Sequence, residues 1–208
     1  LGTQIKTEWL SETEFCISQG QEVYVDSIEE PRISRERSQQ KTSPGTKEEK
    51  GVYMSVLGQL MWHAISLASW LCYEVSVLAS RTNQLTVEDL LSLRKAVRKA
   101  HQYKHLKVRY YRLGLGDRMP TVIQEADSSL QNLESHRSQQ AFFILLTAPK
   151  RNVTDFINSE PVLANLIVWK SQSSPRVVIS TFAGETQATF AGFDLSLIHI
   201  SEPTRPID

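Results

Sequence analysis

The chain has 208 residues, of which 40% are hydrophobic, so it can bury one good-sized core or two small ones. Its 23 Lys and Arg residues balance its 23 Asp and Glu residues, which leaves a formal charge of zero but says nothing of how evenly they are mixed. Cys16 and Cys72 are the only cysteines, which excludes a disulfide framework and a thiolate metal cage.

The first 50 residues are polar. Two short alternating stretches, residues 14–17 and 22–25, predict a small hairpin or edge strands around Gly20. From Glu29 to Lys50 the composition is mainly Glu, Arg, Lys, Ser, Gln and Pro, which buries little surface and predicts a linker. The chain begins at Leu1 without a charged leader, and we expect it to be a fragment of a longer protein.

Residues 51–80 are the most apolar part and contain no Lys or Arg. A membrane-spanning helix is one interpretation of this stretch. Gln59, His63 and Glu74 argue against it, because a charged side chain at the centre of a spanning helix costs about 2.5 to 3.5 kcal/mol. The stretch therefore predicts buried helices inside a globular domain, with His63 in the core.

A clearly patterned helix follows Thr86, whose hydroxyl can cap the first turn while Asp89 occupies the capping-box position. Apolar side chains recur on one face of this helix, and Lys and Arg occupy the opposite side. Eight cations and no acid lie between positions 94 and 112. A solvated helix face is the plain interpretation, but the absence of interleaved acids favours contact with a phosphate backbone. The predicted nucleic-acid-binding residues are Arg94, Lys95, Arg98, Lys99, Lys104 and Lys107.

From residue 122 the pattern changes from helix to strand. Ser180 or Thr181 can cap a helix over residues 182–193. Several strands followed by a helix predict an α+β fold with a mixed sheet. The predicted strands cover residues 122–127, 141–147, 166–169 and 177–179.

Residues 195–205, near the end of the chain, are interpreted separately from the rest. Residues 195–205 read Leu-Ser-Leu-Ile-His-Ile-Ser-Glu-Pro-Thr-Arg, which resembles the end of a transposon-based sequencing adapter translated in frame. A native strand followed by a Pro-rich tail is the alternative. We exclude this stretch, with His199 and Glu202, from the fold and site predictions and expect it to make few contacts.

Three segments, in the right order, resemble the copia-type retrotransposon polyprotein. The first is similar to the family's Tyr-Arg-Ser-x-x-Gly-x-Leu-x-Trp/Tyr motif and reads Tyr53-Met54-Ser55-Val56-Leu57-Gly58-Gln59-Leu60-Met61-Trp62. The second continues it at the right distance and reads Tyr73-Glu74-Val75-Ser76-Val77-Leu78-Ala79-Ser80-Arg81. The third is the most specific and follows the family's Trp-Lys-Ser … Pro-x-Val-x-x-Ser-Ser-Thr-x-Ala-Glu without a gap, at Trp169-Lys170-Ser171, Pro175, Val177, Ser180 and Glu185.

The resemblance covers roughly residues 14 to 193 and implies the end of a reverse transcriptase joined to the first half of a ribonuclease H. The implied fold is α+β: a helical thumb or connection segment, then a truncated ribonuclease H-like mixed sheet with one covering helix. The implied domains are a reverse transcriptase remnant with a polar linker (1–50), the thumb or connection region (51–118), the N-terminal half of ribonuclease H (119–194) and the adapter-like tail (195–208).

The resemblance also implies a site. The family's nuclease uses two Mg²⁺ ions held by a carboxylate cluster, and the match puts its strand Asp at Asp127 and its helical Glu at Glu185. Two further Asp ligands, and the polymerase's paired aspartates, have no counterpart in this chain. The pattern alone allows plainer roles, a strand-end turn acid for Asp127 and a dipole-favoured acid for Glu185. Asp26 is no polymerase motif, because it stands alone where two aspartates are required.

Two departures from the family pattern indicate a decaying copy. The family's Thr-Arg-Pro-Asp falls on Leu67-Ala68-Ser69-Trp70, and Gly184 stands inside a helix, where it costs about 0.5 to 1 kcal/mol.

We therefore predict a polyprotein fragment that is inactive alone and binds nucleic acid without sequence preference. The alternative is a non-catalytic helical protein-interaction module. Mg²⁺ is the cofactor of the intact family enzyme, with none bound tightly here. The expected partners are nucleic acid and the rest of the polyprotein, and the expected location is intracellular, without a signal peptide or a transmembrane segment.

Overall fold

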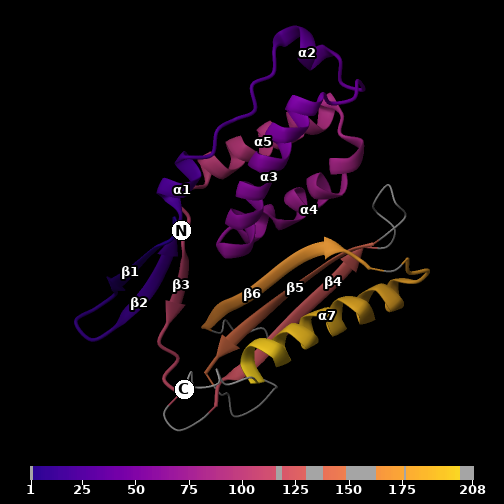
Figure 1. Ribbon diagram of the computed structural model, residues 1–208. Coiled ribbons are helices and arrows are strands. Elements are labelled where there is room, and N and C mark those ends of the chain that lie inside the picture. The colour runs from indigo at the N-terminus through magenta and orange to yellow at the C-terminus, as the bar shows by residue number, and fades with distance from the viewer. Residues whose placement is uncertain (1, 116–118, 130–137, 149–162, 176, 202–208) are drawn as a thin grey trace, which may run out of the picture. The chain divides into compact units, whose positions relative to one another are not determined.

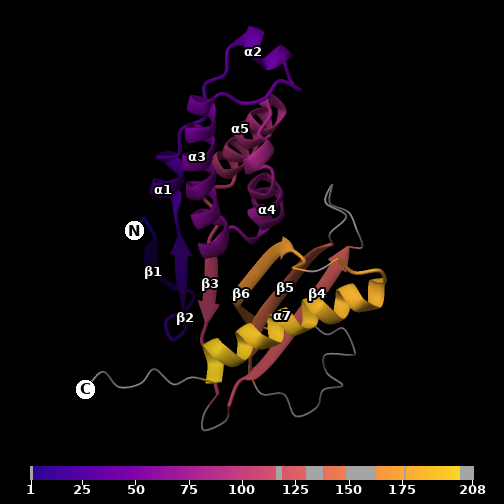
Figure 2. The same cartoon turned by 45° about the vertical axis from the view of Figure 1, so that its right-hand side comes forward.

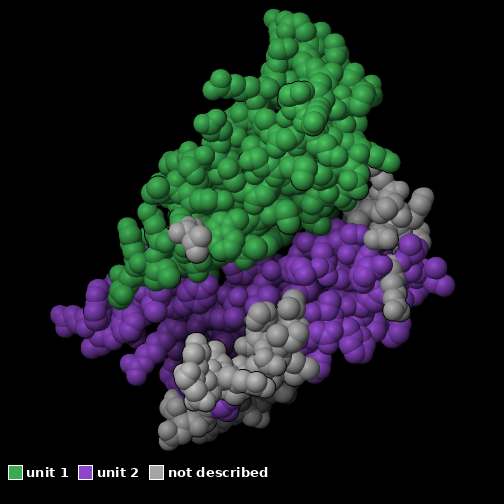
Figure 3. All heavy atoms as spheres, viewed as in Figure 1, with its two compact units in different colours: residues 1–7, 18–108 green, residues 8–17, 109–208 purple. Residues whose placement is uncertain are grey.

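The fold is α+β (Figure 1). It comes from a computed structural model that describes residues 2–115, 119–129, 138–148, 163–175 and 177–201, with side chains described as far as residue 194. The chain divides into two compact units, which Figure 3 colours separately: residues 1–7 with 18–108, and residues 8–17 with 109–208. In the part of the chain that the structure describes, no helix is long and apolar enough to cross a membrane.

The first unit is built on three helices, α3 (Lys47–Ser66), α4 (Cys72–Ser80) and α5 (Val87–Gln102). Short helices complete it: α1 (Glu22–Asp26), α2 (Arg35–Gln39), η1 (Ser69–Leu71) and η2 (Thr82–Gln84). Large side chains from the three long helices and η1 are fully buried together and form its core, among them Tyr53, Leu60, Leu71, Leu90 and Leu93. The helices predicted within residues 51–80 are confirmed, but only one side of α3 is buried, and Met54 and Ile65 are exposed.

Capping boxes begin the two longest helices of this unit. In α5, the Thr86 hydroxyl accepts the N–H of Asp89 (3.4 Å), and the Asp89 carboxylate accepts the N–H of Thr86 (2.9 Å). The predicted start of this helix is confirmed. Thr46 and Glu49 make the same reciprocal pair at α3 (3.2 and 2.8 Å), so that helix begins earlier than its apolar residues suggested.

Residues 29–50 are not a linker, and this prediction is wrong. Pro31 is buried, and the Gly45 N–H donates to the Leu85 carbonyl (2.8 Å). Arg37 and Glu49 form an ion pair at 2.8 Å, which brings α2 against the start of α3. Some polar side chains of this segment, such as Glu30 and Arg37, find partners within the unit, which composition alone does not reveal.

A small sheet contains β1 (Gln4–Trp9), β2 (Phe15–Gly20) and β3 (Val108–Tyr111) in the order β1-β2-β3. The strand expected at residues 14–17 lies in β2. Residues 22–25, however, form α1 rather than a strand. Val25 is buried and Val23 is 64% exposed, and residues two apart point in nearly opposite directions in a helix as well as in a strand.

The second unit contains the antiparallel sheet β4 (Thr121–Ser129), β5 (Gln139–Thr147) and β6 (Ala164–Ser173), in that order. Helix α7 (Thr181–Ser201) lies across one face of it (Figures 1 and 2). The strands expected within residues 122–127, 141–147 and 166–169 are confirmed. Residues 177–179 form no strand, and Ile179 is 90% exposed. Pro175 just before them lacks the N–H that a sheet ladder needs.

Helix α7 starts where a cap was predicted, because the Ser180 hydroxyl accepts the N–H of Ala183 (3.2 Å). Two glycines face the sheet. A Cβ on Gly184 would lie 2.5 Å from Ser128 Oγ, and one on Gly192 would lie 2.5 Å from Gln124 Nε2. Gly184 therefore has a packing role against Ser128, and its interpretation as a mark of decay stays a prediction.

The backbone of α7 continues to Ser201, past the predicted end at residue 193. The side chains of residues 195–201, and all of residues 202–208, lie outside the described part of the chain. The expectation that the adapter-like stretch makes few contacts, with His199 and Glu202 in it, therefore stays a prediction.

Candidate nucleic-acid interface

Strand β4 and helix α7 position the two carboxylates that the family resemblance implies. Ser128 and Gln124 are the β4 side chains that meet α7: Ser128 lies beside Gly184, and Gln124 Nε2 donates to the Thr189 carbonyl (2.7 Å). Successive side chains of a strand point to opposite faces. Asp127, next to Ser128, therefore points to the face that α7 does not cover.

A shared metal site needs Asp127 and Glu185 to converge, and the alternation of side chains along β4 argues against that. The first turns of α7 lie beside the end of β4, so the two backbones are close, but only Glu185 belongs to the helix-covered side. Both carboxylates are exposed, and Asp127 Oδ1 accepts the N–H of Ser128 (2.8 Å). Nothing in this arrangement directs the two acids towards a common point.

A pair of Mg²⁺ ions needs several carboxylates in one small region. In the described parts of the chain, no group of three or more His, Cys, Asp or Glu side chains could hold a metal ion. With Asp127 directed away from Glu185, the described residues do not fit the Mg²⁺ pair of the intact family enzyme.

Among the six predicted phosphate-binding cations, Arg98, Lys99 and Lys104 contact acids from other elements. Lys107 is not free either. Arg98 Nε lies 2.9 Å from a Glu30 oxygen, and Lys99 contacts Glu74 while its Nζ lies 5.6 Å from the centre of the Trp70 ring. Lys104 Nζ lies 2.8 Å from Asp26, and this hydrogen bond raises the pKa of Lys104. These pairs reduce the positive potential that the basic run suggested.

The partners of these cations could not be seen in the sequence, because they lie 68, 25 and 78 positions away along the chain. A run of cations without interleaved acids is therefore a poor measure of local charge once the chain folds.

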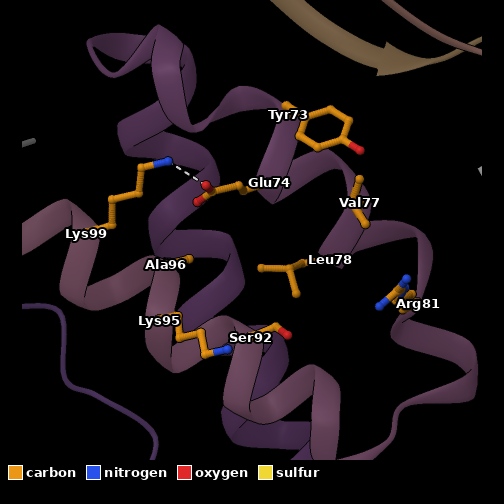
Figure 4. A pocket seen from close by; sticks show the side chains of 9 residues that line it. All are labelled: Tyr73, Glu74, Val77, Leu78, Arg81, Ser92, Lys95, Ala96 and Lys99. Carbon is orange, nitrogen blue, oxygen red and sulfur yellow. Dashed lines mark hydrogen bonds and ion pairs between the residues drawn. The ribbon is translucent and has the colours of Figure 1, made fainter. Parts of the chain in front are cut away.

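Arg94 and Lys95 differ from these three, because neither makes a hydrogen bond or an ion pair with a described residue. Figure 4 shows Lys95 at the edge of a groove between α4 and α5, beside Leu78 and Ala96. In the same view, Lys99 on the next turn of α5 is tied to Glu74. Lys95 thus keeps a free ammonium group at the rim of an apolar groove of about 280 Å³.

Arg32 is a further cation that sequence reasoning missed. It lines a cavity of about 490 Å³ together with Arg94 and Glu30, and no described residue pairs with its guanidinium group. It lies in the segment interpreted as a linker. The one available signal was a set of three apolar residues spaced among charged ones, at Ile28, Pro31 and Ile33.

Comparisons with known proteins add no assignment: no family model, no curated protein and no solved structure matches the chain.

Proposed function

We propose that the chain is a non-catalytic, nucleic-acid-binding piece of a copia-type retrotransposon polyprotein, from the end of its reverse transcriptase into its ribonuclease H. The α+β architecture supports this origin, since a helical unit precedes a three-stranded antiparallel sheet and a helix that covers one of its faces. The non-catalytic part rests on the resemblance, because two of the family's Asp ligands have no counterpart in this chain.

One observation carries the binding part of the proposal. The polar side of α5 holds four cations within two turns, Arg94, Lys95, Arg98 and Lys99. Among the described residues, two acids pair with them, Glu30 and Glu74. Four cations against two acids leave a formal charge of +2 on this helix face. Lys and Arg contacts to phosphates supply most sequence-independent affinity for nucleic acid. The attraction is local, because the chain as a whole is neutral, so the binding is weak and sensitive to salt.

The test compares two cations without a partner among the described residues with one cation that is already paired. Binding of a labelled duplex is followed by fluorescence anisotropy from about 50 to about 200 mM salt. The double variant Arg94→Gln with Lys95→Gln weakens binding and flattens the slope of log affinity against log salt. Lys104→Gln, whose cation is already held by Asp26, is the matched control and changes the slope little. If the slope of log affinity against log salt is the same in both variants, the polar side of α5 does not bind nucleic acid and is a solvated face.

The second candidate function is the helical protein-interaction module, and a specific observation favours it. The outward face of α3 carries Met54, Met61, Trp62 and Ile65, which are between 38% and 60% exposed. No charged side chain lies on this helix beyond Lys50. Large exposed apolar faces of this kind mark binding surfaces.

A variant on α3 tests whether this apolar face takes part in binding nucleic acid. Met61→Asp with Trp62→Ala leaves nucleic-acid affinity unchanged if α3 serves a protein partner, because the cations of α5 are untouched. A large loss of nucleic-acid affinity in this variant would instead make α3 part of the nucleic-acid interface and remove the observation that favours a protein partner.

A further inference from the structure

A short segment before α2 forms one wall of the 490 Å³ cavity. Ile28 and Pro31 are buried and anchor this segment on the helical unit. Glu30 is held by Arg98 at 2.9 Å, so the segment cannot slide along α5 without breaking an ion pair. Ser34 then caps α2 by accepting the N–H of Arg37 (3.2 Å). These contacts fix the backbone on both sides of Arg32.

The charges around this cavity do not cancel. Arg32 is exposed, Arg94 is partly buried, and both line the cavity without a partner among the described residues. The carboxylate of Glu30 also lines it, but Arg98 already neutralises that acid. Three arginines against one carboxylate leave a formal charge of +2. Like charges that line one space repel each other, and an anion between them removes that cost.

We propose that this cavity binds a phosphate monoester group, held between Arg32 and Arg94. A terminal phosphate carries a charge of about −1.5 to −2 at neutral pH, which matches the formal charge of the cavity. A backbone phosphodiester or a carboxylate carries only a single charge. The planar guanidinium group also presents paired N–H donors that fit phosphate oxygens.

The uncharged residues that line the cavity, Pro31, Ile33 and Ser34, contribute little to recognition of the phosphate. Ser34 is committed to the cap of α2, and its hydroxyl also helps to lower the pKa of Glu36, after the backbone hydrogen bond of that residue. Pro31 and Ile33 supply apolar surface. The cavity is a shallow depression that is largely open to solvent. Its open side leaves room for the sugar attached to a phosphate.

This inference deepens the proposed function, because it assigns a nucleic-acid end to a place on the proposed interface. Its test compares two single-stranded oligonucleotides of one sequence, one with a 5′-phosphate and one with a 5′-hydroxyl, by fluorescence anisotropy. The phosphorylated strand is expected to bind about tenfold more tightly, the effect of hydrogen bonds to a charged group. Arg32→Gln removes that preference. Arg35→Gln, three residues further along the chain and outside the cavity, is the matched control and keeps it.

Titration calorimetry with inorganic phosphate, at constant ionic strength, separates the possible sources of the group. If inorganic phosphate binds and Arg32→Gln abolishes its binding, while neither oligonucleotide binds, the cavity takes a free phosphate and the proposed nucleic-acid function fails. If both oligonucleotides bind equally and inorganic phosphate does not bind, the cavity assignment is overturned, and the proposed function stands.

Discussion

His63 is a residue whose environment fixes its protonation. It lies on α3 with 0% of its surface exposed. Its Nδ1 lies 2.8 Å from Gln21 Oε1, so Nδ1 carries the hydrogen and donates to the amide oxygen, while Nε2 has no partner among the described residues. Burial lowers the pKa of His63 from 6.5 to about 4, because the charged imidazolium would lose its water.

We expect the chain to lose stability as the pH falls from 6.5 towards 4. The unfolded chain takes up this proton near its ordinary pKa, and the folded chain takes it up only near the lowered value, so the stabilisation is complete above pH 6.5 and disappears at low pH. The loss is on the order of 3 kcal/mol. Urea unfolding at several pH values measures it. His63→Asn keeps a donor towards Gln21 without the titration, and an equally steep pH dependence in that variant would contradict the assignment.

At the residue scale, the sequence predicted His63 as a core residue because it lacks ligand partners at metal spacing, and the structure confirms its burial. It could not predict which cations keep a free charge. Arg98 and Lys95 look alike in the basic run, yet Glu30 reaches only Arg98. Such a difference arises from contacts between distant segments.

At the scale of elements, the packing of α7 on its sheet depends on glycine. The Gln124 amide occupies the place where a Cβ of Gly192 would lie, and it also donates to the Thr189 carbonyl (2.7 Å). Gly192→Ala is therefore expected to lower the free energy of unfolding by about 1 kcal/mol or more, although alanine favours helix. Chemical denaturation measures the change.

Gly58 of α3 is the matched control for this prediction, because a Cβ there would meet nothing within 4 Å. Gly58→Ala is expected to raise the free energy of unfolding by about 0.5 to 1 kcal/mol, since only helix propensity changes. If both substitutions change the free energy of unfolding in the same direction, packing against β4 is not the reason for glycine at position 192.

The positions of the strands and helices were largely predictable from the sequence. Which side chains at the end of β4 point towards α7 was not. The apolar runs of β5 and β6 and the caps of α5 and α7 carry strong local signals. The end of β4 reads Ala-Asp-Ser-Ser, and a period of two fits either face equally well when small and polar residues alternate. The predicted metal site needs Asp127, rather than Ser128, to point towards α7. The packing of Ser128 on Gly184 and the hydrogen bond from Gln124 to α7 determine that choice.

At the scale of the whole molecule, we expect no nuclease activity. The chain should leave the RNA strand of an RNA/DNA hybrid intact in Mg²⁺, because Asp127 and Glu185 do not share a face. A gel assay with an end-labelled hybrid checks this, with Asp127→Asn as the comparison. Cleavage that requires Mg²⁺ and disappears in Asp127→Asn would show that the site is complete.

The central claim is that a few unpaired cations, rather than the whole basic run, bind nucleic acid. The slope of log affinity against log salt for the wild-type chain on duplex DNA tests it most directly, because each neutralised phosphate contributes about −0.9. Engagement of Arg32, Arg94 and Lys95 predicts a slope of about −2.7, whereas all six cations of the original prediction would give about −5.4. An affinity that does not change with salt, or no measurable binding at low salt, would contradict the account.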